Sequence, residues 1–222
     1  MVVWQDRETR LFHHVGTLEA DPAGDYRFQY QPEARLAPNF RPFMAFPDSD
    51  RQYRSTALFP FFSNRVMSPS RPDFGAYLDA LGLTRDQADP VELLARSGGA
   101  RATDTVQIVA EPITENGVET ARFLVSGCRY IDGADERIAR LVAGQPLRVR
   151  PEPENPQDSP ALLLDVTSGD PVGWVPRYLL DYLHKHIDQG ADVQVYAERV
   201  NGPEASWHMR VLARLEVRPA NG

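Results

Sequence analysis

The hydrophobic residues of the first half of the chain follow the periods of short strands and then of helices. Between residues 26 and 30 aromatic and polar residues alternate, and this period of two predicts a half-buried strand. A second strand-like run covers residues 15–18, and residues 106–109 have the composition of a closing strand. The first half therefore contains a small sheet.

Helical spacing appears in the middle of this half. Over residues 74–81 hydrophobic residues recur at i, i+3, i+4 and i+7, and Gly82 follows as a stop signal. A second helix is predicted to begin at Asp89, which has the N-cap position with proline at N1 and glutamate at N3, and to end before Gly98. Residues 58–62 are mostly aromatic and are expected in the core.

The second half is richer in strands. Strands are predicted at residues 122–130, 147–150, 161–166, 173–175, 193–196 and 209–217. Helices are predicted at residues 135–142 and 176–187. Six short strands in about a hundred residues favour an antiparallel barrel, closed or nearly closed, with the two helices at an end. The predicted class is α+β: a small mixed sheet with helices, then an OB-like antiparallel β-barrel.

A polar segment separates the two halves. It contains Pro112 and the Asn116-Gly117 pair, which are turn formers. We therefore predict a first domain over residues 1–110, a linker over 111–120 and a second domain over 121–222.

Composition narrows the class of protein. The chain has 222 residues, of which 42 % are hydrophobic, enough for a folded core. It has no apolar run of the roughly 18 to 20 residues that a membrane span needs, and its N-terminus lacks a signal-peptide pattern. A single cysteine, Cys128, cannot form an internal disulfide. These features indicate a cytoplasmic protein without a membrane partner.

Charge limits where a nucleic acid could bind. The net charge is −7, which excludes an overall basic coat. Lys185 is the only lysine, and both halves hold twelve basic residues, so the preference for arginine indicates genomic composition more than function. The segment 122–150 has six arginines against three acidic residues. Any nucleic-acid contact is therefore expected on one small face.

Motifs for catalysis are absent from the sequence. Neither a Ser-His-Asp order with supporting signatures nor a glycine-rich phosphate loop is present. His184 and His186 are two residues apart on a predicted helix and point to different faces, which argues against a metal pair. Cys128 has no base motif beside it and is expected to be a buried structural thiol. We expect no catalytic residue, metal or cofactor.

Four motifs of the second half resemble those of HIRAN domains. They are Ser126-Gly-Cys-Arg-Tyr130, Gly144-Gln-Pro-Leu147, Glu152-Pro-Glu-Asn-Pro-Gln-Asp158 and Val172-Gly-Trp-Val-Pro-Arg177, and the likeness covers about residues 121–218. HIRAN domains occur beside Swi/Snf-type helicases and in bacterial proteins. The resemblance implies an OB-like fold, and a site that in fork-remodelling helicases holds the 3′ end of single-stranded DNA.

The resemblance and the residue chemistry together predict a nucleic-acid site of seven residues. They are Arg129, Tyr130, Asn155, Asp158, Trp174, Arg177 and Trp207. An arginine beside an aromatic ring suits a phosphate next to a stacked base, and an amide and a carboxylate in a turn suit a base edge and a sugar hydroxyl.

Each of these residues also has a structural interpretation. Arg129, Tyr130 and Asn155 could seal the barrel, and Asp158 could cap a turn. Trp174 and Trp207 fit packing at the barrel rim as well as stacking.

Two neighbouring positions depart from the DNA-binding members of the family. Glu154 replaces a neutral polar residue, and Gln157 replaces an aromatic residue. An acid beside a phosphate path weakens binding, and loss of a ring removes roughly 1 to 3 kcal/mol of stacking per base.

The first half resembles the N-terminal subdomain of HipA-type kinases over about residues 10–108. The likeness rests on Val15-Gly-Thr-Leu18, Phe43-Met-Ala-Phe46 and Leu58-Phe-Pro-Phe-Phe-Ser-Asn64. It implies contact with partner proteins and no kinase activity, because the catalytic domain is absent. Two segments depart from the family pattern: Arg65-Val-Met-Ser-Pro69, and Arg101-Ala-Thr-Asp104 after the glycine pair.

Two functions follow from these resemblances. The first is a non-catalytic adaptor that binds single-stranded DNA or a DNA 3′ end with its second domain and a protein with its first. The alternative is an antitoxin-like module that restrains a separate HipA-type kinase and binds little or no DNA. The acidic first half, with a net charge of −5, and the substitutions Glu154 and Gln157 favour the alternative.

Overall fold

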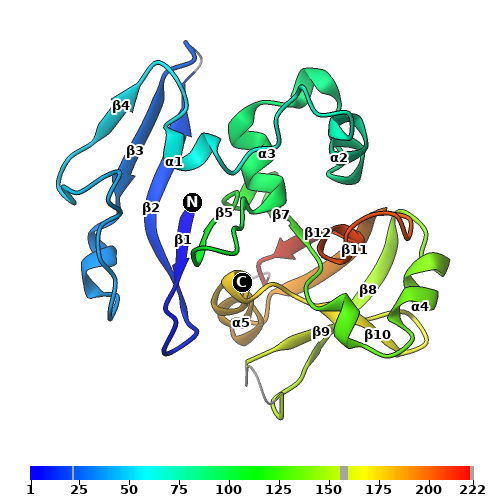
Figure 1. Cartoon of the computed structure of the whole chain (residues 1–222). Coiled ribbons are helices and arrows are strands. Elements are labelled where there is room, and N and C mark those ends of the chain that lie inside the picture. The colour runs from blue at the N-terminus through cyan, green and yellow to red at the C-terminus, as the bar shows by residue number, and fades with distance from the viewer. Residues whose placement is uncertain (22, 156–159, 221–222) are drawn as a thin grey trace. The chain divides into compact units, whose positions relative to one another are not determined.

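A computed structural model describes residues 1–21, 23–155 and 160–220 of the chain. The chain forms two compact units (Figure 1). The N-terminal unit comprises Met1–Gly75 and Thr84–Ala110, and the C-terminal unit comprises Ala76–Leu83 and Glu111–Gly222. Within the described residues, no helix is both long enough and apolar enough to cross a membrane.

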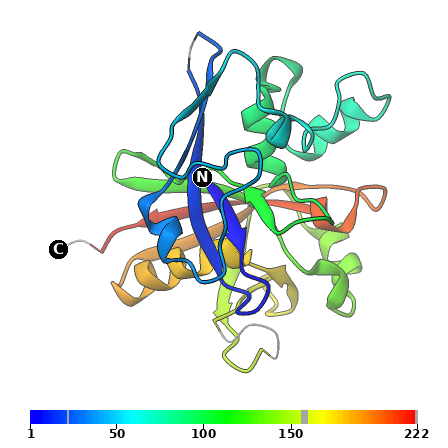
Figure 2. The ribbon, with the colours of Figure 1, turned by 60° about the vertical axis from the view of Figure 1, so that its left-hand side comes forward.

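The N-terminal unit is built on a five-stranded sheet with the order β4-β3-β2-β1-β5. Its strands are β1 (Val2–Gln5), β2 (Phe12–Ala20), β3 (Tyr26–Tyr30), β4 (Tyr53–Ser55) and β5 (Val106–Ile108). The longest strand, β2, is dark blue in Figures 1 and 2. Every described pairing in this sheet is antiparallel. The predicted mixed sheet is therefore an antiparallel one, because β1, β2 and β3 follow one another by direct reversals and β5 runs opposite to β1.

Aromatic residues fill the core of this unit. Phe28 from β3, Phe46 and Phe62 are almost completely buried, and the Phe28 ring lies 4.4 Å from the Phe46 ring. The Tyr30 hydroxyl donates to the Phe46 carbonyl at 2.9 Å and accepts from the Phe43 amide at 2.7 Å, while its burial raises the Tyr30 pKa to about 12. These bonds join the loop before β4 to the sheet. The apolar run over residues 58–62 lies in the core only in part: Phe62 is fully buried, while Leu58, Phe59 and Phe61 are partly buried against the core. Part of the run forms the helix α1 (Pro60–Ser63).

The two predicted helices of the first half are present. They are α2 (Phe74–Ala80) and α3 (Pro90–Ser97), with the 3-10 helices η1 (Pro32–Leu36) and η2 (Arg85–Gln87) elsewhere. The Asp89 carboxylate accepts the amide of Val91 at 2.8 Å, which is the predicted N-cap. Gly98 ends α3 with a φ of 76°, a left-handed conformation that favours glycine.

The C-terminal unit holds a seven-stranded antiparallel sheet with the order β10-β9-β8-β11-β12-β7-β6. Its strands are β6 (Ile113–Glu115), β7 (Val118–Leu124), β8 (Gln145–Pro151), β9 (Leu162–Asp165), β10 (Pro171–Trp174), β11 (Asp192–Val200) and β12 (Val211–Arg218). Its helical segments are α4 (Ala134–Arg140), α5 (Leu180–Asp188), η3 (Cys128–Tyr130), η4 (Arg177–Leu179) and η5 (Trp207–Met209). The class α+β is thus confirmed for the chain.

This sheet is not a closed barrel. Ser126, two residues after β7, forms one antiparallel bridge with Trp174 at the end of β10, and its two backbone bonds measure 2.9 Å each. A ladder does not develop because Gly127 then enters a left-handed turn with a φ of 72°. The sheet is therefore strongly curved, and the segment after β7 meets the edge strand β10 at this one bridge instead of pairing with it along a strand.

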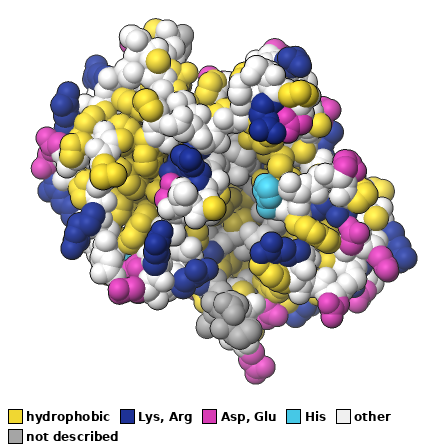
Figure 3. Space-filling view, in the orientation of Figure 1, with side chains coloured by type: hydrophobic (Ala, Val, Ile, Leu, Met, Phe, Trp, Pro, Cys, Tyr) yellow, Lys and Arg dark blue, Asp and Glu magenta, His cyan; other side chains and the backbone are white. Residues whose placement is uncertain are grey.

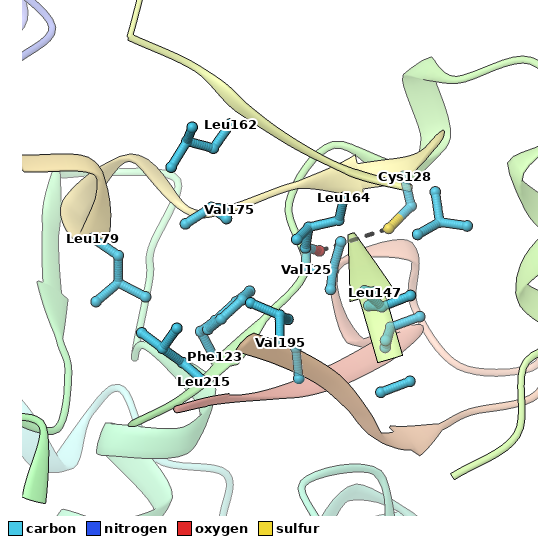
Figure 4. Close-up of a cluster of buried hydrophobic side chains, with 14 of the residues drawn as sticks. Phe123, Val125, Cys128, Leu147, Leu162, Leu164, Val175, Leu179, Val195 and Leu215 are labelled. Carbon is cyan, nitrogen blue, oxygen red and sulfur yellow. Dashed lines mark hydrogen bonds between the residues drawn. The ribbon is translucent and has the colours of Figure 1, made fainter. Parts of the chain in front are cut away.

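Aliphatic side chains from strands along the whole curved sheet meet in the core of the C-terminal unit (Figure 4). Leu162 and Leu164 of β9 are fully buried there, and Phe123 of β7 is 1 % exposed. Cys128 lies in the same core, where its thiol donates to the Val125 carbonyl at 3.7 Å. Burial raises the pKa of this thiol to about 11, so the expected buried structural thiol is confirmed.

Three differences from the predicted elements concern the strands. The strand expected over 122–130 ends at Leu124, and Arg129 and Tyr130 lie in η3 instead. The segment 111–120, predicted as a linker, contributes β6 and the start of β7 to the sheet, with Asn116 and Gly117 in the turn between them. Three short strands, β1, β4 and β6, were not predicted, because runs of three or four residues carry little periodic signal.

Candidate nucleic-acid interface

An arginine and an exposed tyrosine form a pair on the 3-10 turn η3. The guanidinium carbon of Arg129 lies 4.5 Å from the centre of the Tyr130 ring, and the Arg129 guanidinium also donates to the Tyr130 hydroxyl. The Tyr130 side chain is 69 % exposed. A guanidinium stacked on an exposed aromatic ring offers a phosphate-binding group and a stacking surface side by side.

The indole of Trp174 lies beneath this turn and is held on several sides. A Cβ atom on Gly127 would lie 2.5 Å from Cε3 of Trp174, so the backbone of the turn packs directly on the ring. The bridge between Ser126 and Trp174 fixes the backbone of the two segments. Trp174 is partly buried and is therefore a fixed support for the turn that carries Tyr130.

Asn155 joins the same group through a carboxylate that the sequence did not single out. The Oε2 atom of Glu152 accepts the Asn155 side-chain amide at 2.6 Å and the Trp174 Nε1–H at 2.7 Å. One oxygen atom thus connects the turn after β8 to the end of β10. The signal for Glu152 was present in the sequence, because it is the first residue of the Glu-Pro-x-Asn motif.

Trp207 is the second exposed aromatic residue near the turn. It begins η5, which packs beside η3, and its side chain is 41 % exposed. The guanidinium carbon of Arg210 lies 5.2 Å from the centre of the Trp207 ring. Arg210 is buried and forms an ion pair with Asp135. Trp207 is therefore an accessible ring on a fixed support, like Tyr130.

The other two predicted site residues are Arg177 and Asp158. Arg177 is partly buried in η4, the turn that precedes α5. Asp158 lies outside the described residues, as does Gln157. The structure brings together Arg129, Tyr130, Asn155 and Trp174, with Trp207 beside them, and the binding role of all seven residues stays a prediction.

The arginines of the basic segment 122–150 are partly used within the unit. Arg122 pairs with Glu198 at 2.8 Å, and Arg137 donates to the Pro171 carbonyl at 2.8 Å. Arg150 donates through Nε to Asp165 at 2.6 Å, a bond that raises the pKa of Arg150. Arg122, Arg129, Arg140 and Arg148 are the exposed arginines of the segment, and since Arg122 is paired with Glu198, the charge available to a ligand is small.

Together these features define the class of protein: an α+β chain of two units, with an exposed arginine and aromatic pair on the C-terminal unit. Among the described residues, no group of three or more histidine, cysteine, aspartate or glutamate side chains is placed to hold a metal ion.

Comparison with protein families identifies both units. Residues 118–218 match the HIRAN domain, and residues 8–102 match the HipA N-terminal domain. The chain therefore contains a HIRAN domain preceded by a HipA N-terminal domain, which confirms both resemblances found in the sequence.

Two solved structures are similar to part of the chain. One is the crystal structure of the HIRAN domain of human HLTF, with 18 % identity over 47 % of this chain and 79 % of that one, and a TM-score of 0.33. The other is a protein from Lactobacillus plantarum, with 20 % identity over 45 % of this chain and 99 % of that one, and a TM-score of 0.34. No curated protein matches the chain.

Proposed function

We propose that this chain is a non-catalytic adaptor whose HIRAN domain binds single-stranded DNA or a DNA 3′ end, and whose HipA N-terminal domain binds a partner protein. The observation that carries the proposal is the Arg129–Tyr130 pair. It is exposed, it is held by the Trp174 support, and it joins a phosphate-binding group to a stacking face.

The DNA proposal predicts specific losses of affinity. Replacing Tyr130 with alanine is expected to weaken binding by about 1 to 3 kcal/mol, or roughly 5- to 150-fold, because one stacked base is lost. Replacing Arg129 with alanine removes a phosphate contact and lowers the slope of log K against log salt by about 1. Fluorescence anisotropy with an oligonucleotide labelled at its 5′ end and carrying a 3′-OH or 3′-phosphate measures both.

Arg140→Ala is the matched control, because it removes the same charge from an exposed arginine of the same unit. Equal losses for Arg129→Ala and Arg140→Ala would show unspecific attraction and contradict the site. So would the absence of binding at low salt. Oligonucleotide recovered intact after incubation with magnesium or manganese supports the absence of catalysis, and cleavage would overturn it.

A specific observation on the N-terminal unit supports the protein partner. Met44, in the loop that joins the sheet to the aromatic core, is 99 % exposed. Beside the neighbouring Phe43 lies a pocket of about 310 Å³, whose aromatic walls also include Trp4 and Phe61. Figure 3 shows hydrophobic side chains gathered over this unit, at the left of the view. Exposed apolar patches of this kind mark sites of protein association.

The same surface also serves the alternative function, an antitoxin-like module that restrains a separate HipA-type kinase. Purification of the tagged chain from its native host is expected to recover one stoichiometric partner, and Met44→Asp is expected to reduce the recovery at least tenfold, since a buried unpaired charge costs more than about 1.4 kcal/mol.

Val142→Asp is the control for this experiment, because Val142 is also well exposed but belongs to the C-terminal unit. A kinase-like partner together with no oligonucleotide binding favours the alternative. Oligonucleotide binding without any partner favours a DNA-binding module alone. Recovery unaffected by Met44→Asp would exclude this surface.

A further inference from the structure

Glu152 contacts two residues of the candidate nucleic-acid interface, although it is not itself one of the residues expected to touch a ligand. It follows β8 directly and is partly buried. Its Oε2 atom accepts bonds from two side chains of different segments, Asn155 at 2.6 Å and Trp174 at 2.7 Å. Bonds to a charged acceptor are the stronger ones and fix the donor's orientation.

Backbone contacts add to the effect of these bonds. The Asn155 amide donates to the Glu152 carbonyl at 3.0 Å, and the Glu152 amide donates to the Ala161 carbonyl at 2.9 Å. The backbone amide and the backbone carbonyl of Glu152 are therefore both hydrogen-bonded, which fixes the start of the turn that contains Asn155. On the other side, the Trp174 ring packs on the backbone of Gly127. A chain of direct contacts thus runs from Asn155 through Glu152 and Trp174 to the turn that carries Tyr130.

We infer that Glu152 is a positioning residue of the nucleic-acid site: its carboxylate sets the orientation of the Asn155 amide and the Trp174 indole and thereby aligns the turn of Tyr130 with the turn of Asn155. The binding part of this inference rests on the proposed function, and the positioning part does not.

Two substitutions separate position from charge. Glu152→Gln keeps a carbonyl oxygen that can accept both bonds, and it is expected to bind the labelled oligonucleotide within about threefold of the wild type. Glu152→Met keeps the length of the side chain and removes the acceptor. It is expected to weaken binding roughly tenfold, as the loss of a charge-assisted bond implies. Glu154→Met is the control for loss of a negative charge, because Glu154 is an exposed acid two residues away, and it is expected to leave binding unchanged or to strengthen it.

A spectroscopic measurement tests the positioning without DNA. The chain has three tryptophans, so the Nε1–H resonances can be assigned by single Trp→Phe variants in ¹H–¹⁵N spectra. The Trp174 resonance is expected to move upfield in Glu152→Met and to stay near its position in Glu152→Gln. If Glu152→Met does not fold, Glu152→Leu also removes the acceptor and is expected to give the same upfield shift of the Trp174 resonance.

The outcomes distinguish the two proposals. An unmoved Trp174 resonance in Glu152→Met overturns the positioning role. Equal losses of affinity in Glu152→Gln and Glu152→Met also overturn it, because the charge itself would then be the essential feature. A wild-type chain that binds no oligonucleotide, together with the expected shift of the resonance, contradicts the proposed function and leaves the positioning of Trp174 supported.

Discussion

Replacing Gly127 with alanine is expected to lower the free energy of unfolding of the C-terminal unit by about 2 to 5 kcal/mol, the sum of a left-handed backbone and an overpacked contact. Gly127 has a φ of 72°, and a Cβ atom there would lie 2.5 Å from the Trp174 ring. The ring cannot easily retreat, because Glu152 holds its Nε1–H. Urea denaturation followed by circular dichroism, with a separate transition for each unit, measures the change.

Gly144 provides the matched control for this substitution. It has a φ of 84°, and nothing lies within 4 Å of a Cβ atom built on it. Gly144→Ala is therefore expected to cost only the backbone part, about 1 to 2 kcal/mol. A Gly127→Ala variant no less stable than Gly144→Ala would contradict the close packing of η3 on Trp174. Oligonucleotide binding is expected to be lost with the packing, since η3 carries both Arg129 and Tyr130.

The fold could be predicted from the sequence wherever a local pattern is complete. The cap at Asp89 and the glycine at position 98 both predict the helix α3, and the alternation over residues 26–30 predicts β3 within its observed bounds. Closure of the barrel could not be predicted, because it depends on the path of the chain after Leu124. A single left-handed glycine there turns a would-be strand into the 3-10 helix that presents Tyr130.

In the candidate site too, local features could be predicted from the sequence and long-range contacts could not. Arg129 and Tyr130 are adjacent in sequence, so their pairing could be expected from chemistry alone. The contact between Glu152 and Trp174 joins residues 22 positions apart, and it depends on the register of β8, β9 and β10. Arg210, which supports the Trp207 ring, carries no motif at all. Residues that support a site depend on contacts between segments distant in sequence or on side chains without a motif, and local sequence patterns do not reveal either.

The two departures of the first half from the HipA N-terminal pattern meet in the structure. Arg65 begins one of the substituted segments, and Asp104 ends the other. Their side chains form an ion pair of 2.5 Å, with the Arg65 side chain only 1 % exposed. The Arg65 guanidinium also donates to the carbonyls of Phe61 and Gly99, each at 3.1 Å. The pair ties the end of α1 to the loop before β5.

Replacing Arg65 with methionine is therefore expected to lower the free energy of unfolding of the N-terminal unit by about 1 to 3 kcal/mol, the cost of leaving hydrogen-bond acceptors without their donor, because Arg65 is buried while Asp104 is 32 % exposed. A double-mutant cycle with Asp104→Asn is expected to give a coupling energy of about 1.5 to 3 kcal/mol, the range of a charge-assisted hydrogen bond. Arg71→Met is the control and is expected to cost under about 1 kcal/mol, because Arg71 and its partner Asp73 are both exposed.

Additive effects of Arg65→Met and Asp104→Asn would show that the two departures are independent. A measured coupling would make them one structural exchange, in which an arginine and an aspartate from distant segments replace the family's residues together. The loop at Asp104 would then stabilise the N-terminal unit by joining the end of α1 to the strand β5. Because Asp104 also lines the pocket beside Phe43, the ion pair would then fix one wall of the surface that we propose for the partner protein.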